Sequence, residues 1–137
     1  MVTKKTLKNL VYTVNGAAIE VHKQLGPGLL ESIYPKCMIH ELTLRGIHFQ
    51  TELTIPIDYK GLSLESNLRC DLFVENCLVV ELKATDKIIP FHVAKLMSYM
   101  NLLDSSIGLM INFNVTNIFD HGQKTYVNNR YSALKEE

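Results

Sequence analysis

Three charged side chains lie within two apolar, strand-like segments in the middle of the chain, and they limit the folds that it can adopt. Residues 68–74 and 78–83 are rich in Leu, Val and Phe, yet they contain Asp71, Glu81 and Lys83. Burial of an isolated charge is costly, so such residues are paired or face a binding site. Glu81 and Lys83 are two residues apart on one strand, and therefore share one face of a sheet.

The position of Asp71 relative to Glu81 depends on the turn between the two segments. A two-residue turn at Glu75 and Asn76 would send Asp71 and Glu81 to opposite faces of the hairpin. A three-residue loop or a bulge would place Asp71 opposite Glu81. We predict the second arrangement, with Asn76 and Cys77 both in the loop.

A group of carboxylates of this kind indicates a particular chemistry. Carboxylates held close together repel one another, so such a site retains a proton or binds a cation. Oxygen ligands without histidine or thiolate favour Mg²⁺ or Mn²⁺, and such an ion with a nearby lysine suits hydrolysis of a phosphodiester. The alternative is a buried ion pair of Glu81 with Lys83, helped by Asp71. The spacing alone leaves both open.

The rest of the chain predicts helices on both sides of a sheet. Apolar residues recur at helical spacing in residues 6–25, about 30–44 and 89–103. Alternating residues after Gly46 predict two strands, with Pro56 suggesting an edge position for the second, and residues 107–113 form a buried strand. One further strand is expected near the C-terminus. The fold class is α/β, with a mixed central sheet flanked by helices.

Composition narrows the remaining possibilities. A chain of 137 residues with 47% apolar content suits a single domain over residues 1–137. Its formal net charge of zero gives no support for a nucleic-acid partner. An odd number of cysteines, without a CxxC pair or a signal peptide, favours the reducing cytoplasm. Charges at His92, Lys95 and Asp104 interrupt the most apolar region, so no membrane-spanning segment is expected.

Two motifs resemble those of known families. Asp71 followed by Glu81-Leu82-Lys83 resembles the PD-(D/E)XK phosphodiesterase superfamily, although Cys70 stands where that pattern usually has proline. More narrowly, residues 28–34 resemble the defining motif of the GxxExxY family. The resemblance covers roughly residues 7–115 through further matching positions, which are His22, 59–61, 69–71, 80–84, His92, Tyr99 and 111–113.

The resemblance implies a restriction-endonuclease-like core and a metal-dependent nuclease that cleaves DNA or RNA. It implies that Glu31, Asp71 and Glu81 bind Mg²⁺ or Mn²⁺, with Glu31 contributed from a helix, and that Lys83 is catalytic. By position alone, Glu31 is a first-turn carboxylate that complements the helix dipole. Tyr34, three residues later on the same helix face, either hydrogen-bonds in the pocket or packs.

One departure from the pattern affects the expected activity. Lys95 stands where related sequences usually carry glutamine, and it could hold a phosphate, share the role of Lys83, or pair with a carboxylate and exclude the metal. Lys95, His92 and Tyr34 are the expected substrate-binding residues. The alternative function is a catalytically inactive nuclease-fold module that binds nucleic acid or a protein partner. A homodimer is a further expectation, by analogy with enzymes that cut two strands.

Overall fold

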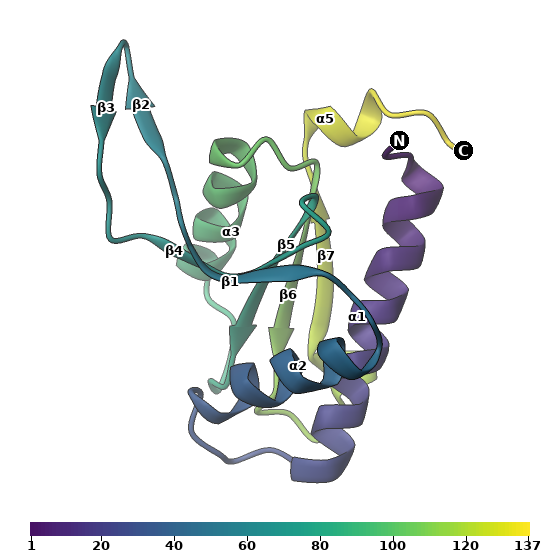
Figure 1. The fold of residues 1–137 in the computed structure, drawn as a ribbon. Coiled ribbons are helices and arrows are strands. Elements are labelled where there is room, and N and C mark those ends of the chain that lie inside the picture. The colour runs from purple at the N-terminus through teal and green to yellow at the C-terminus, as the bar shows by residue number, and fades with distance from the viewer.

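Helices and strands follow one another in the mixed order that the sequence predicts. The computed structural model describes residues 1–137 (Figure 1). The elements, in chain order, are α1 (Lys4–Leu25), α2 (Ile33–Leu44), β1 (Phe49–Thr54), β2 (Ile57–Tyr59), β3 (Leu62–Leu64), β4 (Arg69–Val74), β5 (Leu78–Lys83), α3 (Pro90–Leu102), β6 (Ile107–Asn112), α4 (Ile118–His121), β7 (Gln123–Val127) and α5 (Asn129–Ser132).

Five strands form the central sheet in the order β1-β4-β5-β6-β7. Neighbouring strands are antiparallel except β5 and β6, which run parallel and are joined by α3. These two central strands are buried almost throughout, which explains why their sequences are nearly continuous apolar runs. The mixed central sheet predicted from the sequence is therefore confirmed.

The helices cover both faces of the sheet, as expected (Figure 1). On one face, Val14, Met38 and Leu42 of α1 and α2 belong to the same buried cluster as Val80 and Leu109 of the sheet. On the other face, buried residues of α3 meet the opposite side of the sheet; they are Leu96, Tyr99 and Met100, clustered with Phe73, Val79 and Met110.

The long helix α1 is defined at both ends. Thr3 and Thr6 form a capping box at its N-terminus, and Gly26, with φ of 72°, follows its last residue. The N-terminal turn also contacts the end of the chain, because the N–H of Lys4 donates to the carbonyl of Lys135 at 2.8 Å. The two chain termini consequently lie close together (Figure 1).

The strands β2 and β3 form a separate two-stranded sheet that projects from the body as an arm (Figure 1). The sequence did not predict β3. The strand after Pro56, β2, lies at a sheet edge as expected, because its only neighbour is β3. The turn of this arm is at Lys60 and Gly61, both with positive φ. Tyr59 and Leu62 remain exposed on it. No helix of the chain is long and apolar enough to span a membrane.

Candidate active site on the hairpin β4–β5

The loop between β4 and β5 sets the register that brings the carboxylates together. Val74 pairs with Leu78 and Leu72 pairs with Val80, so the loop consists of the three residues 75–77. Glu75 and Asn76 adopt left-handed backbone conformations, with φ of 51° and 56°, which turn the chain tightly. The predicted three-residue loop is confirmed, and its register places position 71 across from position 81.

Asp71 and Glu81 each accept a hydrogen bond from the opposite strand. The N–H of Asp71 donates to Glu81 Oε2 at 2.9 Å, and the N–H of Leu82 donates to Asp71 Oδ2 at 2.8 Å. Carboxylate oxygens thus take the place of backbone carbonyls where the regular ladder ends. The two side chains are fixed on the hairpin by strong, charge-assisted bonds.

The backbone of β4 departs from regular alternation beside Asp71. Cys70 and Phe73 belong to the same buried cluster under α3, although residues three apart in a regular strand face opposite sides. On β1, Glu52 lies across from Asp71 and has a φ of 48°. Because of this irregularity, the N–H of Asp71 donates to the side chain of Glu81 and not to a backbone carbonyl of β5.

The second oxygen of each carboxyl group receives no hydrogen bond from an N–H. No lysine or arginine forms an ion pair with either group, and a side-chain hydrogen bond between Asp71 and Glu81 lowers the pKa of Asp71. The only fully buried side-chain oxygen or nitrogen without a partner is Asn15 Oδ1. A cation that replaces the proton between Asp71 and Glu81 would contact these second oxygens.

Electrostatics at this site disfavour two negative charges. Burial raises the pKa of Asp71 above its ordinary value. Burial, together with the charge of Asp71, raises the pKa of Glu81 to about 7, and its side chain is only 2% exposed. A divalent cation between the two groups would relieve this repulsion.

Two lysines supply positive charge near the carboxylates. Lys83 lies on β5 on the same face as Glu81, and its charge lowers the pKa of both Asp71 and Glu81. Lys95 extends from α3, lowers the pKa of Glu81, and has its Nζ 5.5 Å from the centre of the Tyr99 ring. Neither lysine is paired with a carboxylate, so the ion pair that would occupy the site is not formed.

Glu31 reaches the end of β5 from the segment between α1 and α2. Its Oε1 accepts the N–H of Ala84, the residue after β5, at 3.0 Å. The expected start of the second helix near Leu30 was wrong, because α2 begins at Ile33 and Glu31 lies in the preceding turn. Glu31 is therefore exposed at the mouth of the site and lies outside the first turn of the helix.

Tyr34 holds the segment that carries Glu31. Its ring is buried and stacks on Phe113, with ring centres 4.4 Å apart. Its hydroxyl donates to the carbonyl of Gly26 at 2.7 Å and accepts the N–H of Leu29 at 3.3 Å. The expectation that Glu31 and Tyr34 share a helix face was wrong, since Glu31 precedes the helix. The Tyr34 hydroxyl acts on the loop and is not turned toward the carboxylates.

His92 lies in the first turn of α3 beside the same charges. Its Nδ1 accepts the N–H of Ile89 at 3.2 Å. Partial burial and the charges of Lys83 and Lys95 lower the pKa of His92, whereas the charge of Glu31 raises it. The structure thus gathers Glu31, His92 and both lysines within electrostatic reach of one another.

The carboxylates fit a metal ion only in part. Their oxygens, of which one in each group receives no N–H, match the preference of Mg²⁺ and Mn²⁺ for hard ligands. No group of three His, Cys, Asp or Glu side chains is arranged to hold an ion, so Glu31 does not form a ready-made set with Asp71 and Glu81. Water molecules would have to complete the coordination, as is usual for Mg²⁺.

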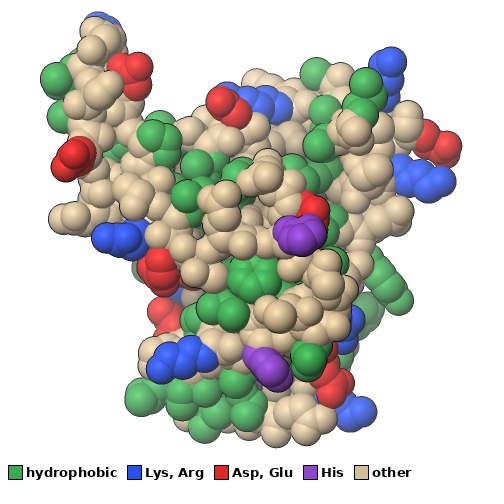
Figure 2. Space-filling model, viewed as in Figure 1, with side chains coloured by type: hydrophobic (Ala, Val, Ile, Leu, Met, Phe, Trp, Pro, Cys, Tyr) green, Lys and Arg blue, Asp and Glu red, His purple; other side chains and the backbone are tan.

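Glu52 also lies near the site, which the sequence does not indicate. Its charge raises the pKa of Asp71, which places a fourth carboxylate near the site, although the side chain is exposed. Nothing in the alternating pattern of β1 distinguishes it from a solvent-facing residue. Elsewhere, acidic and basic side chains are interspersed on the face shown in Figure 2, as the zero net charge implies.

Comparison with known proteins agrees with the geometry of this hairpin. No curated protein and no solved structure matches the chain. The model of the PD-(D/E)XK nuclease superfamily matches residues 8–125, which include most of α1, the main sheet as far as residue 125 in β7, and all four expected catalytic residues. Because this match covers most of the chain, the protein belongs to the PD-(D/E)XK nuclease superfamily.

Proposed function

We propose that the protein is a metal-dependent nuclease that hydrolyses phosphodiester bonds in DNA or RNA with Mg²⁺ or Mn²⁺. The observation that carries this proposal is the pair formed by Asp71 and Glu81. Each group is fixed by a backbone N–H, the two groups lie within hydrogen-bond distance of each other, and both lie near Lys83. Two repelling carboxylates at neutral pH are unfavourable for stability alone and are useful for holding a cation.

Asp71 and Glu81 would hold the metal ion through their second oxygens, and Glu31 would complete the site through its Oε2, which has no protein partner. A bound ion would supply charge stabilisation at the phosphate and a water molecule of lowered pKa. Lys83 adds a positive charge at the same place and assists the attacking water. The fixed hairpin costs no reorganisation during the reaction.

The surrounding residues have supporting roles in this proposal. Lys95 and His92 lie on α3 beside Lys83 and Glu81, where they would contact a phosphate of the substrate. Because Lys95 is not paired with a carboxylate, it leaves the metal ligands free. Tyr34 acts indirectly, since its hydroxyl positions the loop that carries Glu31.

The finer assignments follow from the sequence motifs. Gly28, Glu31 and Tyr34 support membership of the GxxExxY family. Tyr34 holds the loop that carries Gly28 and Glu31, which supports the motif as a structural unit. Three free cysteines are compatible with a reducing cytoplasm. A homodimer would place two such sites on a double-stranded substrate.

Cleavage of labelled DNA and RNA by the purified protein tests the proposal. Asp71→Asn and Lys83→Ala should each lower the metal-dependent rate by about a hundredfold or more, while circular dichroism shows an intact fold. Asp58→Asn and Lys8→Ala, exposed residues of the same types on the arm and on α1, should cleave like the wild type. If cleavage survives both site substitutions, the assignment is wrong.

The second candidate is a nuclease fold without turnover that binds nucleic acid or a protein. Two observations favour it. No three His, Cys, Asp or Glu side chains are arranged to hold a metal ion, and Lys95 in α3 stands where related sequences usually carry glutamine. Calorimetry with Mn²⁺ tests this candidate, because a module in which Lys95 pairs into the pocket should give no saturable heat. A saturable heat that disappears in Asp71→Asn, together with metal-dependent cleavage by the wild type, would eliminate it.

A further inference from the structure

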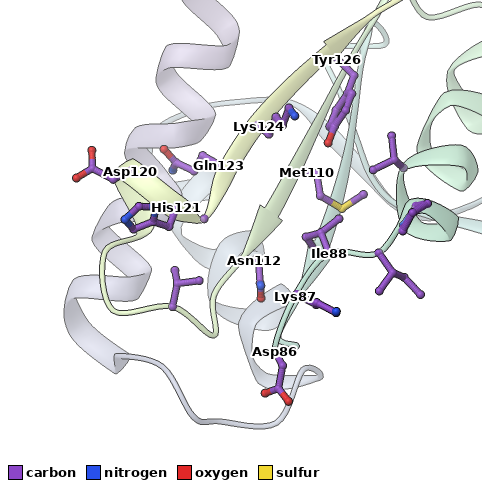
Figure 3. A pocket seen from close by; sticks show the side chains of 15 residues that line it. Asp86, Lys87, Ile88, Met110, Asn112, Asp120, His121, Gln123, Lys124 and Tyr126 are labelled. Carbon is purple, nitrogen blue, oxygen red and sulfur yellow. The ribbon is translucent and has the colours of Figure 1, made fainter.

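A groove of about 670 Å³ lies on the same face of the sheet as the acidic site, and none of Glu31, Asp71, Glu81 and Lys83 lines it (Figure 3). Its floor contains Met110 of β6, and Lys124 and Tyr126 of β7 border it. Pro90 and Val93 of α3 close the opposite side. The helix packs mainly against β5 and β6, so this part of the sheet remains open. The volume lies within the range of ligand-binding pockets.

The register of the sheet connects the groove with the acidic site. Met110 is paired with Glu81 on one side and with Lys124 on the other, so the three side chains lie in one row across the sheet. Adjacent strands are about 5 Å apart, which puts β7 about 10 Å from β5. A strand of nucleic acid with one phosphate at the carboxylates would therefore reach the groove with a neighbouring nucleotide.

The lining of the groove combines an aromatic ring with cations. The ring of Tyr126 is partly buried and its hydroxyl end points into the groove (Figure 3). Lys124 Nζ lies 5.4 Å from the centre of this ring, and Lys87 stands at another edge in the loop between β5 and α3. The carboxylates of Asp86 and Asp120 lie at the rim and point away from the centre (Figure 3). An aromatic platform with flanking lysines is the combination that binds bases and phosphates of a single strand.

We propose that Tyr126 stacks on a base, and Lys124 and Lys87 bind backbone phosphates, of a nucleotide next to the bond cleaved at the acidic site. This assignment rests on the proposed nuclease function and adds a substrate subsite to it. The two lysines are balanced by Asp86 and Asp120 at the rim, so attraction of a phosphate to the groove is local, in a chain that has no net charge to attract nucleic acid at long range.

Binding of fluorescein-labelled oligothymidylate and oligouridylate in EDTA tests the subsite. EDTA prevents cleavage, so this measurement does not depend on the proposed catalysis. Tyr126→Ala should weaken binding about tenfold, whereas Tyr126→Phe should bind like the wild type because the ring is retained. The matched control is Tyr59→Ala on the arm, where Lys60 Nζ lies 5.4 Å from the ring of Tyr59 outside the groove. This control should not change affinity.

The salt dependence of binding gives a second readout that a purely structural role would not alter. Removal of one phosphate contact in Lys124→Ala should lower the slope of log affinity against log salt by about 0.7. The subsite is supported if the wild type binds either oligonucleotide, Tyr126→Ala binds it more weakly and Lys124→Ala shows the lower salt slope. Wild-type affinity in Tyr126→Ala, or no binding of either probe, overturns it. If Tyr126→Ala binds and cleaves like the wild type, the subsite is wrong and the nuclease proposal stands. If the wild type binds the oligonucleotides but does not cleave them with metal, the nuclease proposal is wrong.

Discussion

Replacement of Glu81 by glutamine should stabilise the metal-free protein at neutral and alkaline pH. The side chain of Glu81 is almost fully buried beside Asp71, and its pKa is raised from the ordinary value of 4.5 to about 7. At about 1.4 kcal/mol for each pH unit between those values, ionisation of Glu81 costs the folded state about 3 kcal/mol. A glutamine retains an oxygen that can accept the N–H of Asp71 and carries no charge.

The pH dependence follows from which state holds the proton. Between about pH 4.5 and pH 7 the folded protein binds more protons than the unfolded chain, so its free energy of unfolding falls as the pH rises. Above about pH 7 the loss is complete. The stability advantage of Glu81→Gln over the wild type should therefore be small near pH 4.5 and should grow to about 3 kcal/mol above pH 7.

Urea denaturation in EDTA at several pH values measures this difference. Glu65→Gln, which removes an exposed carboxylate on the arm, should give a difference from the wild type that does not vary with pH. If the difference between Glu81→Gln and the wild type is equally constant across this range, burial beside Asp71 does not raise the pKa of Glu81.

Three further predictions concern the supports of the site and of the fold. Tyr34→Phe should lose about 1 kcal/mol of unfolding free energy and lower the cleavage rate, because the bonds to Gly26 and Leu29 disappear; unchanged kinetics would contradict its positioning role. Thr3→Ala should cost about 1 kcal/mol by thermal denaturation, with Thr3→Ser close to the wild type. Asn112→Ala should increase hydrogen exchange in the loop after β5, which its buried side chain holds by two bonds; full protection there would refute this.

Part of the site was predictable because side chains along a strand point alternately to the two faces of the sheet. Glu81 and Lys83 share a face for that reason alone, and burial of Leu72, Val74 and Leu78 on the opposite face requires the three-residue loop. A shorter turn would have exposed one apolar side of the hairpin. The predicted register of the carboxylates therefore followed from the hydrophobic pattern.

The start of α2 was predicted wrongly because Leu30 was taken for part of an apolar helix face. Leu30 is 74% exposed, whereas the buried residues Tyr34, Met38 and Leu42 recur every four positions from Ile33 onward. Pro35 carried a usable signal. Proline lacks an N–H and is tolerated in the first turn, which places the start of the helix close to it.

Other features depend on tertiary contacts that no local pattern contains. The strand β3 is three residues long and wholly exposed, so it leaves no periodic signature of burial. Glu52 approaches Asp71 only because β1 pairs with β4 and its own backbone is left-handed. The contact of Glu31 with Ala84 joins residues 53 positions apart, and spacing along the chain cannot predict it.

A crystal soaked in Mn²⁺ shows whether Asp71 and Glu81 hold a metal ion, because anomalous scattering locates the ion without reference to activity. We expect one strong peak in contact with Asp71 Oδ1 and Glu81 Oε1, which disappears in Asp71→Asn. If no density lies between these two side chains at saturating Mn²⁺, the hairpin does not form a metal site.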